Sequence, residues 1–170
     1  GDVTWQSNAT HASALWFGFH DEQSDIASFT ACLGTPKQEC SVLTQTTAQA
    51  TNIEVSDLAL EEGATYVWTV TAESGAGETV VSRSSGWTVD TTPPDVSGAF
   101  IVDAWAKVGE SVAQDIDSAT DVSFYEVSWG GIEDEVSGID HFTVRLGWSS
   151  GDDDVAPRVT LPAGTWRYAF

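Results

Sequence analysis

The two cysteines of the chain, Cys32 and Cys40, lie eight residues apart and flank a turn-forming segment from Gly34 to Glu39. In an extracellular protein, this spacing favours a disulfide bridge across the short loop. Two buried free thiols are the alternative interpretation. A zinc site is disfavoured, because no second pair of Cys or His residues has the spacing of metal ligands.

A second possible site of covalent chemistry is the Asn-Ala-Thr sequence that begins at Asn8, which matches the acceptor motif for N-linked glycans. The motif is common by chance, so it is informative only together with signs of secretion. Serine and threonine are also dense in residues 44–51 and at Thr91-Thr92, where O-linked sugars could be attached. Ordinary strand and turn propensities explain the same composition. Attached glycans are therefore an expected partner, with Asn8 as the leading site.

Clustered carboxylates could bind calcium, which takes about six to eight oxygen ligands. The weak candidates are Asp21, Asp25 and Asp134, with a further acidic run at residues 152–154. No EF-hand spacing occurs among them. Asp21 and Asp134 each stand before a Ser-x-Ile sequence, where a carboxylate can accept backbone N–H bonds within a turn. The turn interpretation is favoured over calcium, and no other metal or cofactor is expected.

The chain contains 8 Trp, which could form a hydrophobic core or a platform on which sugars stack. Trp16 and Trp129 occupy equivalent positions in an internal repeat and adjoin predicted strands, so a core role is favoured for them. Three tryptophans lack such a context, and they are the candidates for contacts with a partner: Trp5, Trp105 and Trp148.

No motif for catalysis is found in the sequence. The chain lacks a Gly-x-Ser-x-Gly elbow, a His-Glu-x-x-His motif and a phosphate-binding loop. Its histidines, His11, His20 and His141, are scattered and have no obvious nucleophile beside them. We therefore expect a protein that is not an enzyme.

Charge and hydropathy disfavour further classes of partner. The 170 residues include 26 Asp+Glu against 6 Lys+Arg, which gives a formal net charge of -20. Nucleic acid is not an expected partner, because phosphate contacts require Lys and Arg. The longest apolar stretch, from Ala14 to Phe19, is far too short to insert across a bilayer. Such acidity fits a solvated surface in a crowded or salty exterior.

An internal repeat organises the chain. Residues 16–26 read Trp-Phe-Gly-Phe-His-Asp-Glu-Gln-Ser-Asp-Ile, and residues 129–139 read Trp-Gly-Gly-Ile-Glu-Asp-Glu-Val-Ser-Gly-Ile, 113 positions later. Phe29 and Phe142 match at the same spacing. Between the copies, Pro93-Pro94 predicts a stiff extended linker. This places one domain at residues 2–91 and the other at residues 92–170.

The second copy differs from the first towards its end. Residues 60–66 resemble residues 161–166, but these two segments are separated by fewer than the 113 positions that separate the other matched residues. We therefore expect a second copy that is shortened in its middle and lacks its final strand. Two explanations stay open: the chain is a window from a longer repeat array, or a neighbouring molecule completes the second sheet.

Alternation of apolar and polar residues predicts strands in both halves. The strongest strand is 66–72, with Tyr66, Trp68, Val70 and Ala72 on one face. The other main strands are predicted at residues 27–33, 51–55, 87–89, 99–102, 122–129 and 141–146. The nearest helix candidate is residues 104–113, and Gly109 weakens it. The expected fold is all-β: two tandem antiparallel β-sandwiches, the second incomplete.

The sequence from Leu60 to Gly77, Leu-x-x-Gly-x-Thr-Tyr-x-Trp-x-Val-x-Ala-x-Ser-x-x-Gly, resembles the late-strand signature of fibronectin type III domains. The resemblance implies that Tyr66 forms a corner by hydrogen-bonding back to the preceding turn. The wider pattern, Trp-x-Gly-x-x-Asp-x-x-Ser-x-Ile followed by Phe and Leu-Gly, is similar to tandem fibronectin type III or immunoglobulin-like repeats. Such repeats occur in large extracellular surface proteins of algae, other protists and invertebrates, including mastigoneme-type proteins of ciliary hairs.

The resemblance implies a structural or adhesive module of an extracellular or cell-surface assembly. Its expected partners are neighbouring copies of itself or adjacent repeats, and docking would use strand edges or exposed aromatic side chains. Two alternatives stay open. One is a carbohydrate-binding accessory module of a secreted enzyme, which requires an exposed tryptophan in the binding surface. The other is a calcium-dependent adhesion domain, which requires Asp21 or Asp134 as a ligand.

Overall fold

The computed structural model of the protein describes residues 4–104 and 125–170, and the chain divides into two compact units, Gly1–Thr92 and Pro93–Phe170. The described residues form strands, turns and loops and contain no helix, which confirms the predicted all-β fold. Trp105, most of the helix candidate at 104–113 and the start of the strand predicted at 122–129 lie outside the described residues.

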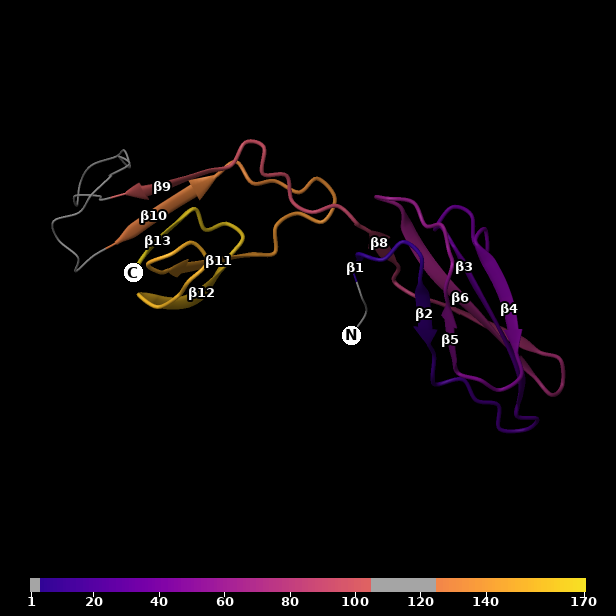
Figure 1. Ribbon diagram of the computed structural model, residues 1–170. Coiled ribbons are helices and arrows are strands. Elements are labelled where there is room, and N and C mark those ends of the chain that lie inside the picture. Colours follow the sequence, from indigo (N-terminus) through magenta and orange to yellow (C-terminus); the bar gives the residue numbers. More distant parts are fainter. Residues whose placement is uncertain (1–3, 105–124) are drawn as a thin grey trace. The chain divides into compact units, whose positions relative to one another are not determined.

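The strands of the first unit are short except for two long central ones, β3 and β6 (Figure 1). Their bounds are β1 Trp5–Gln6, β2 Ala12–Leu15, β3 Ile26–Gly34, β4 Leu43–Thr47, β5 Asn52–Val55, β6 Thr65–Ser74, β7 Thr79–Arg83 and β8 Trp87–Val89. Thr and Val are frequent in β6 and β7, as expected for strands, because β-branched side chains suit a pleated surface.

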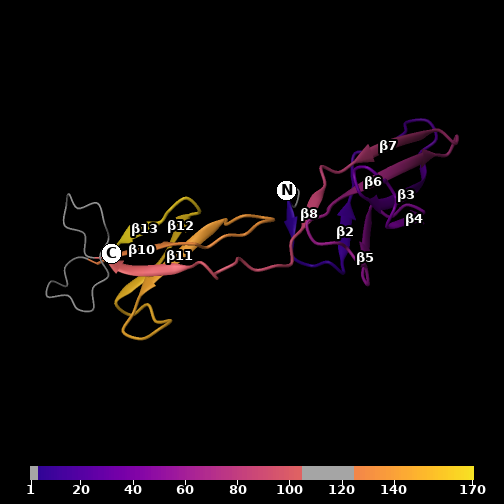
Figure 2. The same ribbon diagram turned by 90° about the horizontal axis from the view of Figure 1, so that it is seen from above.

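Two sheets build the first unit. The larger sheet has the order β1-β8-β6-β3-β4, and β7 also pairs with β6. Its neighbours are antiparallel except for β1 and β8, which are parallel. β2 and β5 form a separate antiparallel pair. Both ribbon views show this pair beside the layer that contains β3 and β6 (Figures 1 and 2).

Side chains of both sheets meet in one hydrophobic core. The cluster of buried residues is Ala12, Trp16, Phe29, Ala31, Leu33, Ile53, Leu60, Tyr66, Trp68, Val70, Ala72, Trp87 and Val89. It includes every residue of the predicted apolar face of β6, but Val67 and Thr69 on the opposite face are buried too, so β6 is covered more fully than the predicted half-buried strand. The first unit is thus a two-layered β-structure whose core lies between the β2–β5 pair and the larger sheet.

Tyr66 makes the contact that the resemblance implied. The backbone N–H of Glu61 donates a hydrogen bond to the Tyr66 hydroxyl at 3.0 Å. The turn that holds Glu61 is also tied to the last residue of β8, because Gly63 N–H donates to the Val89 carbonyl at 2.9 Å. The tyrosine therefore joins the start of β6 to the turn that precedes it.

Replacing Tyr66 with phenylalanine should lower the free energy of unfolding of the first unit by about 1 kcal/mol, because the partly buried Glu61 N–H loses its acceptor. Urea unfolding followed by tryptophan fluorescence measures the change. Tyr168→Phe in the second unit is the matched control, and it should leave the first unit unchanged. Equal stability of Tyr66→Phe and the unmodified protein would contradict a stabilising role for the contact.

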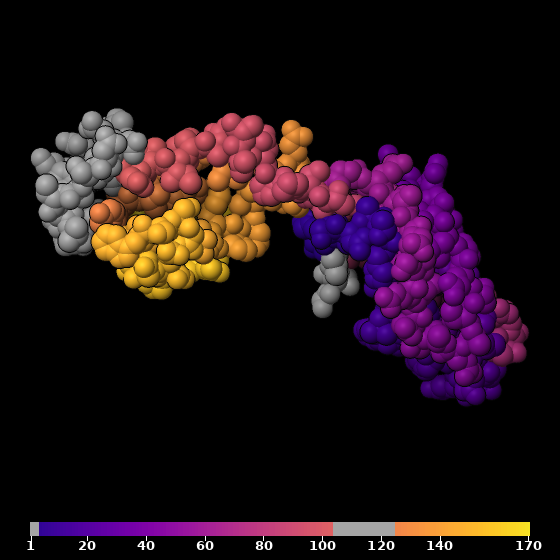
Figure 3. Space-filling model, viewed as in Figure 1, coloured from indigo at the N-terminus to yellow at the C-terminus, as the bar shows by residue number. Residues whose placement is uncertain are grey.

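The second unit also contains two sets of paired strands. Their bounds are β9 Phe100–Ala104, β10 Glu126–Gly130, β11 His141–Leu146, β12 Ala156–Pro162 and β13 Arg167–Ala169. β10 lies between β9 and β13, and β11 pairs with β12; all three pairings are antiparallel. In Figure 3 the yellow C-terminal residues pack directly against the orange segment that contains β10 and β11. Trp129 is buried, and Phe142 is half-buried against it.

The sequence repeat has a structural counterpart in each unit. Trp16 meets Phe29 edge to face with ring centroids 5.6 Å apart and an interplanar angle of 60°. Trp129 meets Phe142 at 5.5 Å and 61°. Backbone conformation repeats too, because the left-handed φ values of 84° at Gly18 and 67° at Gly131 fall at the same spacing. Two distant segments therefore adopt one local structure.

The last strand of the second unit differs from the expectation. The echo at residues 161–166 predicted that the chain ends in a counterpart of β6. Instead β13 pairs with β10, just as β5 pairs with β2, and β13 lies about 113 positions after β5. The described part of the second unit thus contains counterparts of β2 to β5 and none of β6 to β8. The spacing of 113 positions is therefore kept through the middle of the second copy. The described part of the second unit differs from the first in the strands that correspond to β6 to β8.

Candidate functional site

The predicted bridge between Cys32 and Cys40 is present. Cys32 is a buried residue of β3, and Cys40 lies in the loop before β4, with the two Cα atoms 4.8 Å apart. The loop is also closed by reciprocal backbone hydrogen bonds of 3.1 Å between Thr35 and Gln38. The disulfide therefore fastens the β3–β4 hairpin, which is a structural role.

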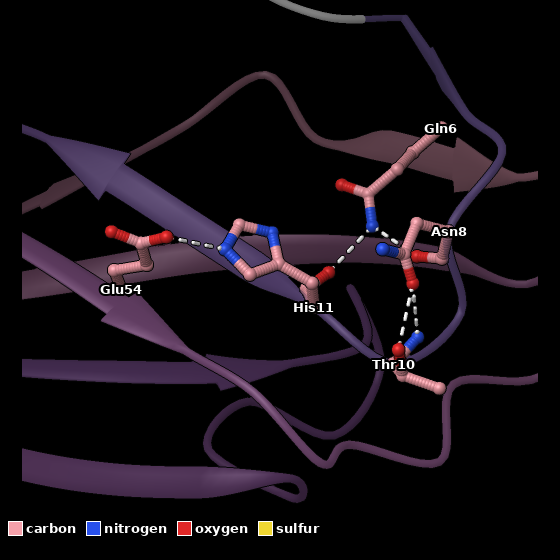
Figure 4. Close-up of polar contacts among 5 residues, drawn as sticks. All are labelled: Gln6, Asn8, Thr10, His11 and Glu54. Atoms are coloured by element: carbon pink, nitrogen blue, oxygen red, sulfur yellow. Dashed lines mark hydrogen bonds and ion pairs between the residues drawn. The ribbon is translucent and has the colours of Figure 1, made fainter.

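Asn8 is exposed in the loop between β1 and β2 (Figure 4). Its side-chain oxygen accepts hydrogen bonds of 2.8 Å from both the backbone N–H and the hydroxyl of Thr10. Gln6, which sequence reasoning did not single out, donates from its amide to the backbone carbonyls of Asn8 and His11. The acceptor motif is thus presented at the surface on a loop with a defined conformation.

Two of the three histidines contact separate acids, His20 Nδ1 lies 3.5 Å from the Gly18 carbonyl oxygen, and the three do not converge on one site in the described residues. His11 Nε2 lies 3.0 Å from Glu54 Oε1 across the β2–β5 pair (Figure 4). His141 Nδ1 lies 2.7 Å from Asp140 Oδ2 in the second unit. Both pairs are largely exposed, so each is a weak surface interaction.

The repeated aspartates organise turns, as the favoured interpretation predicts. Asp21 Oδ1 accepts from the backbone N–H groups of Gln23 and Ser24 at 2.9 and 2.8 Å. Asp134 Oδ1 accepts in the same way from Val136 and Ser137 at 3.1 and 2.8 Å. Each carboxylate also accepts a bond from the serine hydroxyl of its own turn.

The residue after each of these serines has a left-handed backbone. It is Asp25 in the first unit, with φ of 56°, and Gly138 in the second, with φ of 71°. Glycine adopts this conformation without steric cost, whereas an aspartate tolerates it with some strain. Asp25 is therefore explained by the turn. Among residues 4–104 and 125–170, no group of three or more His, Cys, Asp or Glu side chains could hold a metal ion.

We expect Asp21→Ala to lower the melting temperature of the first unit and Asp21→Asn to lower it less, since the amide oxygen can still accept the turn hydrogen bonds. Backbone N–H bonds from Ser24 and Gln23 lower the pKa of Asp21. A carboxyl whose pKa is lower in the folded state stabilises the fold above its unfolded pKa, about 3.9, and loses this effect as pH falls through the folded pKa.

The melting temperature measured from about pH 5 to about pH 2 tests this sign, because that window spans the titration of an ordinary and of a lowered carboxyl pKa. The unmodified protein should lose more stability across this window than Asp21→Asn does. Glu22→Gln removes the same charge from an exposed neighbour and serves as the control. Parallel curves for the unmodified protein and Asp21→Asn would contradict the prediction.

The predicted partner-facing tryptophans that the structure describes are exposed. Trp5 in β1 is 43% exposed, and Trp148, in the turn after β11, is 86% exposed. Trp166, which the sequence reasoning passed over, is also exposed and carries the Arg167 guanidinium 4.8 Å from its ring centroid. The sequence around Trp166 carries no pattern that marks this side chain as exposed.

A groove of about 640 Å³ lies in the first unit, between β2 with the residues after it and the connection from β7 to β8. Its aromatic lining comprises Trp16, Phe17, Phe19, Trp68 and Trp87. Phe17 is 86% exposed, whereas Trp16 and Trp68 belong to the core. The groove offers an apolar surface of a kind that could receive a sugar ring or a side chain of a partner.

No helix among the described residues has the length and hydrophobicity needed to span a bilayer. No family model matches the chain, and no curated protein matches it with significance.

Proposed function

We propose that this protein is a non-catalytic structural or adhesive repeat module of an extracellular assembly or filament. The observation that carries the proposal is the recurrence of one local structure, the Trp–Phe pair and the Asp turn, in two units 113 positions apart. The features that the two β-units share are core and turn residues. Tandem units of this kind suit a protein with a structural role in a repeat array.

The strand order supports a relationship to immunoglobulin-like and fibronectin type III sandwiches. In the first unit, β7/β8, β6, β3 and β4 follow the G-F-C-C′ order of such domains, and β2 with β5 corresponds to B with E. The hydrogen bond to the Tyr66 hydroxyl is the corner contact of that family. In the second unit, β9-β10-β13 corresponds to A-B-E, and β11-β12 to C-C′.

Three observations support an extracellular location. The Cys32–Cys40 bridge persists in oxidising compartments. Asn8 is exposed in an acceptor motif for N-linked glycans, so attached sugars are proposed there. The net charge of -20 keeps a surface hydrated in a crowded exterior.

Docking between modules would use the exposed apolar side chains. Phe17 and Trp148 are each 86% exposed, and Ile101 in β9 is 70% exposed. Large apolar groups at the surface lose unfavourable contact with water when a partner covers them. The proposed mechanism is therefore reversible burial of aromatic and aliphatic surface between neighbouring modules.

Sedimentation velocity across a concentration series tests the proposal. The average mass should rise with protein concentration and should rise further between about 0.05 M and about 0.5 M salt, because screening weakens repulsion between acidic modules. Trp148→Ala and Phe17→Ala should reduce association, and the exposed polar variant Gln23→Ala should not. A chain that stays monomeric at every concentration and salt would count against the proposal.

Carbohydrate binding is a second candidate, because the aromatic groove of the first unit exposes Phe17 beside Leu15. Sugar rings stack on such apolar faces. Isothermal titration with a panel of soluble oligosaccharides should then give binding that Phe17→Ala abolishes. Binding to no member of the panel would remove this candidate without affecting the structural proposal.

A further inference from the structure

β4 forms one edge of the larger sheet in the first unit. It pairs with β3 on one side, and no other described strand pairs with it. β1 and β8, by which the chain enters and leaves this unit, lie at the opposite edge of the same sheet (Figure 1). The open edge of β4 is therefore remote from the segments that join this unit to the rest of the chain.

This edge lacks the features that usually keep strand edges apart, which are charged side chains, prolines and bulges. Residues 40–53 contain no Asp, Glu, Lys, Arg, Pro or Gly. The register between β4 and β3 also runs from Leu43 to Thr47 without a shift. Other edge strands are protected, because β5 contains Glu54, β7 contains Arg83 and β12 contains two prolines. The unpaired N–H and C=O groups of β4 thus remain a template for a further strand.

Charge and sequence symmetry favour a second copy of the chain as that strand. Two chains with a formal net charge of -20 each repel one another over most of their surface, and an uncharged segment is where they can approach at least cost. β4 is also symmetrical around its central residue, because Thr44 and Thr46 flank Gln45 and all three side chains are exposed. An antiparallel pair of β4 strands therefore sets equivalent side chains opposite each other.

The geometry of a sheet restricts the register of such a pair. Paired residues must point to the same face, so the two-fold axis must pass through a residue and not between two residues. An axis at Gln45 sets the two Gln45 amides opposite each other, and each amide both donates and accepts hydrogen bonds. It also sets Thr44 opposite Thr46 of the second copy on both sides of the axis.

Threonine pairs across strands are already a feature of this unit. The hydroxyls of Thr30 and Thr46 lie 2.9 Å apart across the β3–β4 pair. Those of Thr65 and Thr88 lie 2.8 Å apart across the β6–β8 pair. Such pairs stabilise neighbouring strands, and the register centred on Gln45 adds two more of them.

We propose that two copies of the chain pair antiparallel through the outer edge of β4, about a two-fold axis at Gln45, and so join their larger sheets into one. The contact is isologous, so it joins two chains and leaves their other surfaces free. It goes beyond the proposed function, because it uses backbone pairing at a polar edge in addition to the exposed apolar side chains.

Amide hydrogen exchange of the full chain at low and high protein concentration locates the contact. Exchange of the β4 amides should slow about tenfold when about nine-tenths of the chains are associated, because the outward N–H groups are then hydrogen-bonded. The edge strand β7 is the internal reference, and its exchange should stay the same at both concentrations.

Gln45→Glu and Gln45→Lys test the register by sedimentation velocity. Each variant alone sets two like charges opposite each other, so its self-association should be at least about tenfold weaker than that of the unmodified chain. An equimolar mixture of the two should associate more tightly than either alone, because Glu then faces Lys. Gln23→Glu and Gln23→Lys make the same charge changes at an exposed site outside β4, and their mixture is the control. Circular dichroism verifies that all four variants keep their β-structure.

The possible results separate this inference from the proposed function. A mass that rises with concentration while the exchange of β4 stays constant would reject this surface and leave the proposed function in place. Slower exchange of β4 with no gain in the Gln45 mixture, or with an equal gain in the Gln23 mixture, would overturn the two-fold pairing. A chain that stays monomeric under all conditions would reject both proposals.

Discussion

Trp16→Ala should lower the free energy of unfolding of the first unit by about 3–5 kcal/mol, the range found for removing a large aromatic side chain from a core. Trp16 is 6% exposed and packs edge to face against Phe29, whose ring also contacts Phe19 at 5.5 Å. Loss of the indole leaves a cavity between the two sheets. Because domains of this size are stable by only about 5–15 kcal/mol, the variant should be close to unfolding.

Trp16→Phe separates packing from hydrogen bonding. The indole N–H of Trp16 has no hydrogen-bond partner among the described residues, so its replacement by phenylalanine removes no hydrogen bond. We expect a clearly smaller loss than for alanine, because the ring contact with Phe29 is partly kept. Trp148→Ala, in which an 86% exposed side chain is removed, should change stability by no more than about 0.5 kcal/mol. Urea unfolding of the three variants measures these differences, and a Trp16→Ala protein as stable as Trp148→Ala would contradict the core assignment.

The features that could be predicted from the sequence are those that depend on short-range pattern. The strand at His141–Leu146 and the closing strand at Trp87–Val89 were predicted with the bounds that the structure has. Alternation along residues 66–72 identified four core side chains because each successive side chain of a strand points to the opposite face. The aspartate turn could be read because a short carboxylate reaches backbone N–H groups only two or three residues ahead.

Pairing between distant segments was harder to predict. β12 was missed because Pro157, Arg158 and Pro162 interrupt any apolar alternation. Prolines are tolerated in a strand with an unpaired edge, and among the described strands β12 pairs with β11 alone. The similarity between residues 60–66 and 161–166 was taken as a shared strand position, although both are turns that lead into a strand. β13 pairs with β10, and the N–H of Trp129 donates to the Trp166 carbonyl at 2.9 Å; sequence similarity does not report such pairing between distant segments.

Only some features of the candidate site could be predicted, because a sequence pattern reports local structure and does not report pairing between distant segments. The bridge followed from the spacing of two cysteines, which is local information. The exposure of Trp166 and the groove beside Phe17 depend on which sheet edges remain uncovered, so they became visible only in the structure. The contact from Gln6 that fixes the loop around Asn8 likewise carries no sequence signature.

Removing the disulfide by Cys32→Ala with Cys40→Ala should lower the free energy of unfolding of the first unit by about 2–3 kcal/mol. The bridge closes a loop with a sequence separation of 8, and closing a loop this short removes a modest amount of conformational entropy from the unfolded chain. Reductant should destabilise the unmodified protein by a similar amount and leave the double variant unchanged. A protein whose urea midpoint is the same with and without reductant would contradict the bridge.

A second double variant, Cys32→Ala with Cys40→Gly, tests whether the bridge also holds the backbone at position 40 in its left-handed conformation. Cys40 has a φ of 59°, in the left-handed region where a side chain costs roughly 1–2 kcal/mol relative to glycine. Once the bridge is absent, glycine at this position should restore about 1 kcal/mol of stability relative to alanine, because it keeps the loop conformation without that cost. If the glycine and alanine variants unfold at the same urea concentration, the loop must have left the left-handed conformation when the bridge was removed. That outcome would show that the disulfide, and not the hydrogen bonds between Thr35 and Gln38, determines the shape of the β3–β4 connection.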